Sequence, residues 1–256
     1  MMPPGADSLL LSAVTATAAG LVGCYALMRR MTLAGDALSH VALPGIGLAV
    51  LLHLHPLAGA LVALLGGGIF IWALERRTGI STEAVIGVVF SAALAVGALL
   101  TTGEELVNAL FGAPGALTPW ELWLGLAGSG LVIAFMIAGR DRLVVSLVSP
   151  EIAVTSGINV KRLHLLYLLA FSLTVALGLR YLGVLLMGSL VIIPATTARR
   201  LARNLTEMLV IAVVVAVLST LLGTYAAGRM HRESGPVIVT IAAASFFLTA
   251  LRRRGR

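Results

Sequence analysis

The chain has 256 residues, of which 59% are hydrophobic and only 11% are charged. Soluble domains usually carry about 25% charged residues, so this composition excludes an ordinary soluble protein and indicates one that lies in a lipid bilayer. The formal net charge of +7 does not indicate nucleic-acid binding, because the basic residues are spread between the hydrophobic runs instead of forming one patch.

Hydrophobic runs long enough to cross a bilayer follow one another along the whole chain. A helix needs about 20 mostly apolar residues to cross the hydrocarbon core. Nine windows meet this requirement, and eight is the alternative count. The windows cover residues 8–28, 33–53, 57–74, 83–102, 120–139, 161–179, 183–199, 207–227 and 236–251. We therefore predict an all-α polytopic membrane protein in which residues 1–256 form a single transmembrane domain.

The positive residues between these windows predict the orientation of the chain. Fifteen of the 18 Lys and Arg residues lie in alternate loops, and three lie in the loops between them. Loops rich in Lys and Arg stay in the cytoplasm, so the amino terminus is expected outside and the carboxyl terminus in the cytoplasm. The start of the chain has no basic segment and contains Asp7, which favours a retained first helix over a cleaved signal peptide.

The second window contains two ionisable residues, Asp36 and His40. Residues four apart share one face of a helix, so both side chains point the same way. An ionisable side chain near the middle of a bilayer costs about 2.5 to 3.5 kcal/mol, which predicts that this face lines a polar pathway or meets a partner. A carboxylate and an imidazole are ligands of Zn²⁺ and also suit Mn²⁺ and Fe²⁺. We predict a transient metal site, shared between two copies of the chain. The alternative is that Asp36 forms an internal ion pair with His40 or binds backbone exposed near Pro44.

Two prolines lie inside predicted helices. Pro44 follows the pair, and Pro194 lies in the seventh window. Proline removes an intrahelical hydrogen bond and can bend a helix. Each proline is therefore a candidate kink along a pathway. A static kink is the alternative for Pro44, and packing near the cytoplasmic face is the alternative for Pro194.

Polar residues in two predicted external loops are weaker candidates. His53 and His55 end the second window, and Glu104 and Glu105 lie in a loop without Lys or Arg. Acids and imidazoles at an entrance raise the local concentration of divalent cations. These four residues form a candidate entry site, with ordinary polar helix ends as the alternative.

The chain has no GxxxxGK[ST] phosphate loop, so any ATP hydrolysis must take place in another polypeptide. The largest predicted cytoplasmic loop, 140–162, contains a helix signal, with a serine cap, a proline in the first position, an acid near the positive end and a glycine stop. We predict a short helix from Glu151 to Gly157 within a coupling segment at about 149–160 that contacts an ATPase. A solvated connector is the alternative. The coupling candidates are Ser149, Pro150, Glu151, Ala153 and Gly157.

Five segments in order along the chain carry a family resemblance. They are RRMTLAGDALSHVALPGIGLA (29–49), EAVIGVVFSAALAVGALL (83–100), LFG (110–112), SPEIAVTSGINVKRL (149–163) and RYLGVLLMGSLVIIPATTARRLAR (180–203). These segments resemble those of the ABC-type permeases that import zinc, manganese or iron. The resemblance implies eight or nine helices, a homodimer in the bacterial inner membrane, two cytoplasmic ATPase subunits and an external solute-binding protein. It also implies that Asp36 and His40 lie along the metal path. Ala113 departs from the pattern, because many members carry an acid after LFG.

These observations together predict a transporter subunit and no enzymatic activity in this chain. The expected function is that of a permease for divalent metal ions, powered by a separate ATPase. The metal is cargo, with zinc favoured and manganese or iron as alternatives, and no tightly bound cofactor is expected. A secondary transporter or channel driven by an ion gradient is the alternative function. An intramembrane metalloprotease is disfavoured, because the chain lacks an HExxH helix motif.

Overall fold

The structure is a computed structural model that describes residues 5–31, 34–100, 118–182 and 184–251. Within these ranges the chain forms eleven helices and no strand, as the sequence predicts for an all-α protein. In chain order the helices are α1 (Ala6–Met28), α2 (Ala34–Leu51), α3 (Pro56–Thr78), α4 (Thr82–Leu100), α6 (Pro119–Ala138), α7 (Arg140–Val148), α8 (Pro150–Thr155), α9 (Val160–Leu182), α10 (Val184–Leu201), α11 (Leu205–Met230) and α12 (Ser234–Leu251).

The predicted hydrophobic windows correspond to the long helices. In the described part of the chain, eight helices are long and apolar enough to cross a membrane, and each coincides with one predicted window. Window 183–199 forms α10, which is not among these eight, so a ninth span stays a prediction. The helices run through Pro44 in α2 and Pro194 in α10 without interruption.

Helix α3 is longer than its hydrophobic window, which ends at residue 74. The helix continues to Thr78 and ends at Gly79, whose φ of 69° lets its backbone N–H donate to the Glu75 carbonyl oxygen. Glutamate and arginine are good helix formers, so the loss of hydrophobicity ended the window without ending the helix. As a result, Glu75 lies on a helix and not in a loop.

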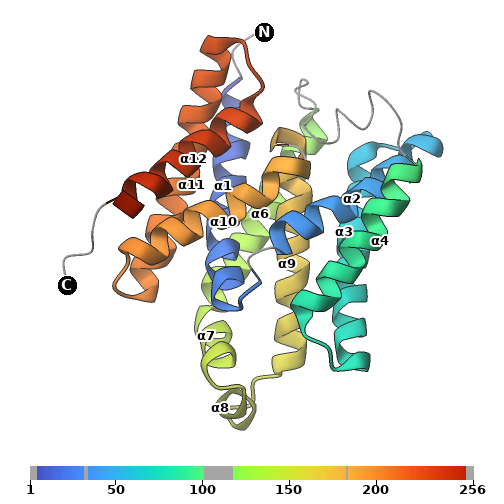
Figure 1. Ribbon diagram of the computed structural model, residues 1–256, viewed down its shortest axis with the longest axis vertical. Coiled ribbons are helices and arrows are strands. Elements are labelled where there is room, and N and C mark those ends of the chain that lie inside the picture. Colours follow the sequence, from blue (N-terminus) through green and yellow to red (C-terminus); the bar gives the residue numbers. More distant parts are fainter. Residues whose placement is uncertain (1–4, 32–33, 101–117, 183, 252–256) are drawn as a thin grey trace.

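Residues 140–162 contain one more helix than expected. The sequence analysis predicted a single short helix there, whereas α7 comes first and α8 follows it. Figure 1 shows α7 and α8 at the lower end of the bundle, where α9 begins and where the turn between α3 and α4 lies. The positive-inside rule predicts that these segments face the cytoplasm, and we call this end of the molecule the α8 end.

The core of the molecule lies among α1, α2, α9 and α10. Its largest fully buried side chains include Tyr25 of α1, and Tyr167 and Phe171 of α9. Figure 1 shows α10 and α2 crossing the middle of the molecule, with α3 and α4 on the right and α11 and α12 on the left. Helix α2 packs mainly against α3, α4 and α10.

Helix α2 approaches its neighbours backbone to backbone. A Cβ added to Gly188 of α10 would lie 2.5 Å from the Asp36 nitrogen and 2.6 Å from its Cα. Gly45 of α2 and Gly59 of α3 also face each other, and a Cβ on either would overlap the backbone of the other. Small residues allow such close crossings between membrane helices. The backbone around Asp36 is therefore held tightly against α10.

We expect Gly188→Ala to destabilise the protein, because the new methyl group would overlap the Asp36 backbone. Overpacking of this kind costs about 1–3 kcal/mol. The melting temperature of the purified protein in detergent measures the effect. Gly66→Ala in α3 is the matched control, since a Cβ there meets nothing within 4 Å. Equal melting temperatures for the two variants would contradict the close crossing.

Candidate functional site

Asp36 lies in the first turn of α2, where the positive end of the helix dipole favours an acid. Its side chain is exposed on the surface of the single chain, although its neighbours Gly35 and Ala37 are buried. The contact with Gly188 fixes the backbone at this point. The carboxylate is therefore presented outward from a rigid position.

His40 lies one turn further along the same face and is half-buried. Its ring contacts Phe90 of α4 edge-on, with 5.3 Å between the ring centroids. Its Nδ1 atom is buried and has no hydrogen-bond partner in the described part of the chain. The histidine ion pairs within the described residues involve His55 and His164, and neither includes Asp36. This geometry does not support an internal Asp36–His40 pair.

The exposed face of α2 continues beyond these two residues. Pro44 and Leu48 follow at the same four-residue spacing, and the Leu48 side chain is 51% exposed. We call Asp36, His40, Pro44 and Leu48 the α2 strip. Ser39 lies outside it, because this residue is fully buried and its hydroxyl donates to the Gly35 carbonyl oxygen at 2.7 Å.

The α2 strip offers few donors for a metal ion in one chain. The described residues contain no group of three or more His, Cys, Asp and Glu side chains that could hold a metal. A tight site for zinc usually has four ligands, or three and a water. One carboxylate and one imidazole fit an exchangeable ion, or half of a site completed by a second copy.

The predicted entry residues belong to the end of the molecule opposite α8, and those that the structure describes differ in their contacts. His55 caps α3, since its Nδ1 accepts a hydrogen bond from the Leu57 N–H at 3.3 Å. Its Nε2 lies 3.6 Å from Oε1 of Glu121, and its ring contacts Trp120 edge-on. His53 is exposed with a φ of 55°. Glu104 and Glu105 lie outside the described residues.

Glu121 is a residue that the sequence analysis missed. It is 5% exposed and forms a capping box with Thr118 at the start of α6, with its carboxylate 3.0 Å from the Thr118 nitrogen. The spacing Thr-x-x-Glu before an apolar run is the sequence signal that could have identified it. The capping box places the buried Glu121 carboxylate beside His55.

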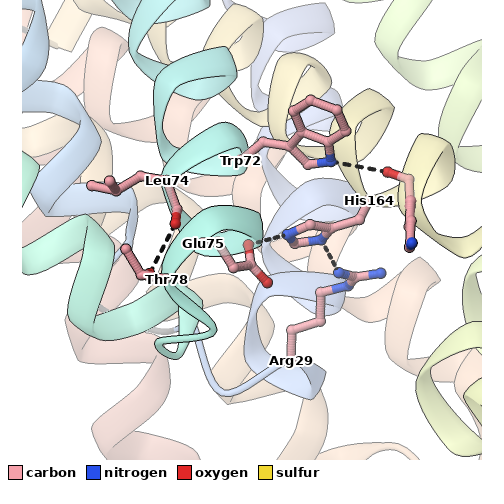
Figure 2. A network of polar contacts seen from close by, with 7 residues as sticks. Arg29, Trp72, Leu74, Glu75, Thr78 and His164 are labelled. Carbon is pink, nitrogen blue, oxygen red and sulfur yellow. Dashed lines mark hydrogen bonds and ion pairs between the residues drawn. The ribbon is translucent and has the colours of Figure 1, made fainter.

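A polar network joins three helices at the α8 end (Figure 2). His164 of α9 lies between Glu75 of α3 and Arg29, the residue that ends α1. Its Nε2 is 2.9 Å from Oε2 of Glu75, and its Nδ1 contacts the Arg29 guanidinium. The Arg29 guanidinium also lies over the Tyr167 ring, 5.1 Å from its centroid. The sequence analysis had not singled out these residues as partners.

Burial dominates the electrostatics of Arg29. Desolvation lowers the pKa of its guanidinium, while Tyr167 and Glu75 act in the opposite direction. Arginine stays charged in proteins even so. Beside it lies a cavity of about 560 Å³, which Arg30, Met31 and Arg76 also line. The network thus packs against Tyr167 on one side and faces this cavity on the other.

The predicted coupling segment forms a capped helix followed by a turn. Ser149 Oγ accepts a hydrogen bond from the Ile152 N–H at 3.4 Å, Pro150 begins α8, and Glu151 lies in its first turn. Ala153 is fully buried, whereas Ile152 and Val154 are 59% and 63% exposed. Gly157 has a φ of 76°. Helix α8 therefore exposes two apolar side chains, Ile152 and Val154, beside the exposed Glu151 and Thr155.

Comparison with known proteins identifies the family. Residues 6–253 match the model of the ABC 3 transport family. The chain is 32% identical to the high-affinity zinc uptake system membrane protein ZnuB of Haemophilus influenzae, over 99% of this chain and 97% of that protein. It is 29% identical to the manganese transport system membrane protein MntC of Listeria monocytogenes, over 95% and 89%.

The fold also matches a solved structure. PsaBC from Streptococcus pneumoniae, solved in complex with a Fab, superposes with a TM-score of 0.82 and 26% identity, covering 95% of this chain and 89% of that chain. The resemblance found in the sequence is thereby confirmed. The chain belongs to the ABC 3 transport family and is a multi-span membrane permease of the ABC-type metal-ion importers.

Proposed function

We propose that this chain is the permease subunit of an ATP-driven importer that carries Zn²⁺, with Mn²⁺ or Fe²⁺ as alternative cargo. The observation that carries the proposal is the α2 strip, in which Asp36 is exposed and His40 half-buried on the surface of one chain. A carboxylate within a membrane span needs a polar cavity or a partner. A metal pathway supplies both, since the ion pairs with the carboxylate as it passes.

The strip favours a homodimer as the transporting unit. Two copies meeting along their α2 strips would bring two aspartates and two histidines together. Four oxygen and nitrogen ligands suit tetrahedral Zn²⁺. The absence of thiolates from this donor set disfavours Cu(I), while the affinity order among divalent ions does not separate zinc from manganese or iron. ZnuB and MntC are named for zinc and for manganese, respectively.

Energy for import would come from two ATPase subunits on the cytoplasmic side. Ile152 and Val154 of α8, with Val148 at the end of α7, give such a partner an apolar docking surface, because all three are more than half exposed. ATP-driven closure would then switch the pathway between outward and inward access. We place the chain in the bacterial inner membrane, with its amino terminus outside and its carboxyl terminus in the cytoplasm.

An external solute-binding protein would deliver the metal to the opposite end. His53, His55, Glu104, Glu105 and the newly found Glu121 are the entry candidates. His55 is already engaged as a helix cap and faces Glu121. The exposed His53, together with Glu104 and Glu105, would offer imidazole and negative charge to an arriving cation before the α2 strip accepts the ion.

Removing either ligand should reduce transport. We expect Asp36→Ala and His40→Ala to lower zinc uptake by about tenfold or more, the order of loss seen when a group supporting a metal site is removed. Uptake of labelled zinc and manganese is measured in vesicles holding the permease, its ATPase and its binding protein. Asp7→Ala, an exposed acid at the start of α1, is the control. Normal transport by both strip variants would refute the site. Uptake driven by an ion gradient without ATP would favour the secondary-transporter alternative.

The turn after α8 offers a separate test of coupling. Gly157→Val forces a branched side chain into the left-handed region, and we expect ATP hydrolysis to continue while metal uptake falls several-fold. Gly130→Val in α6 adds the same side chain where a Cβ meets nothing within 4 Å, and it is the control. Both activities are measured in the same vesicles. An unchanged ratio of metal carried to ATP hydrolysed in Gly157→Val would contradict the coupling role of α8.

A further inference from the structure

Helix α8 is joined to α9 by a turn that hydrogen bonds hold. The Gly157 N–H donates to the Val154 carbonyl oxygen at 3.0 Å, and the Ile158 N–H donates to that of Ala153 at 2.9 Å. Asn159 then caps α9, accepting a hydrogen bond from the Arg162 N–H at 3.0 Å. Hydrogen bonds on both sides of the turn make it a stiff joint. A displacement of α8 therefore moves the first turns of α9.

Those first turns of α9 are bonded to two other helices. The Trp72 Nε1–H of α3 donates to the Lys161 carbonyl oxygen at 3.1 Å, next to the His164–Glu75 contact (Figure 2). On the other side, the Tyr167 hydroxyl donates to the Val22 carbonyl oxygen of α1 at 3.1 Å. The start of α9 thus lies between the ends of α1 and α3.

The direction of the hydrogen bonds in the network follows from the donors present. A guanidinium has no acceptor, so Nδ1 of His164 must accept from Arg29. A neutral imidazole then carries its hydrogen on Nε2 and donates it to the Glu75 carboxylate. The ring thus bridges the Arg29 guanidinium and the Glu75 carboxylate. Removing the ring would leave the partly buried Arg29 guanidinium and Glu75 carboxylate without the imidazole as their shared hydrogen-bond partner.

Arg29 is close to the α2 strip along the chain. Asp36 follows it by seven residues. The Met31 N–H donates to the Ala26 carbonyl oxygen at 2.9 Å, and the Ala34 N–H donates to that of Met31 at 3.1 Å. The end of α1 is therefore bonded to the start of α2. A cavity of about 560 Å³ lies beside Arg29 and Met31.

We propose that Arg29, His164 and Glu75 form a positioning network that transmits the movement of α8 to the α2 strip. The inference rests on the proposed function, because it assigns a route between the ATPase contact and the metal ligands. The three residues hold α1, α3 and α9 as one unit, so movement at α9 carries the α1 end and the first turn of α2 with it. The network touches no metal and acts through Asp36 and His40.

The test compares metal uptake and ATP hydrolysis in the same vesicles of the complete transporter. His164→Leu removes both hydrogen bonds, and Glu75→Gln keeps the shape of the side chain without its charge. We expect each to lower the metal carried per ATP by about fivefold or more, the lower end of typical allosteric couplings, while ATP hydrolysis continues. His164→Gln should restore much of the ratio, since an amide can accept from Arg29 and donate to Glu75 together.

Glu83→Gln is the matched control, because Glu83 lines the same cavity but has no part in the network. Its ratio should equal that of the wild type. A wild-type ratio in His164→Leu and Glu75→Gln, or a proportional loss of both activities in them, would overturn the proposal. Failure of the wild-type complex to take up metal with ATP would instead refute the proposed function. Glu75→Gln keeps the test decisive even if His164→Leu does not fold.

Discussion

The structure depends on one constraint, which is that an ionisable side chain in an apolar surrounding must find a partner. Among the residues that the structure describes, two groups meet it. In the first group, His164 contacts both Glu75 and Arg29 between three helices. In the second, Glu121 contacts Thr118 and His55. Asp36 is the exception, because it is exposed on a helix that is otherwise largely buried. Asp36 forms no ion pair in the part of the chain that the structure describes, and under the proposed function a passing cation beside a second copy of the same helix would pair with it.

Close backbone packing makes this exposure possible. Helix α2 contacts α10 through Gly35 and Gly188 and contacts α3 through Gly45 and Gly59. Between apolar helices in lipid, such contacts replace the hydrophobic driving force that operates in water. Because the backbone is held on those sides, the remaining face of α2 is free to carry polar side chains. The same close packing leaves little free space around α2, so a displacement of its first turn should also displace the residues before it.

Hydrophobic periodicity and length predicted most of the fold, because the thickness of the bilayer sets the length of a span. The errors arose where that rule does not apply. Helix α7 and the last turn of α3 lie beyond the hydrophobic windows, and there helix propensity and a glycine cap decide where the helix ends. Asp36 and His40 could be placed on one face because their spacing is local.

The sequence by itself determined the all-helical membrane class, the helix signals around α8 and the shared face of Asp36 and His40, since each depends on residues within a few positions of one another. The tertiary structure alone decided which groups pair. His164 lies 89 residues from Glu75 and 135 from Arg29, and no local pattern relates positions so far apart. Their contact exists only because α1, α3 and α9 pack side by side.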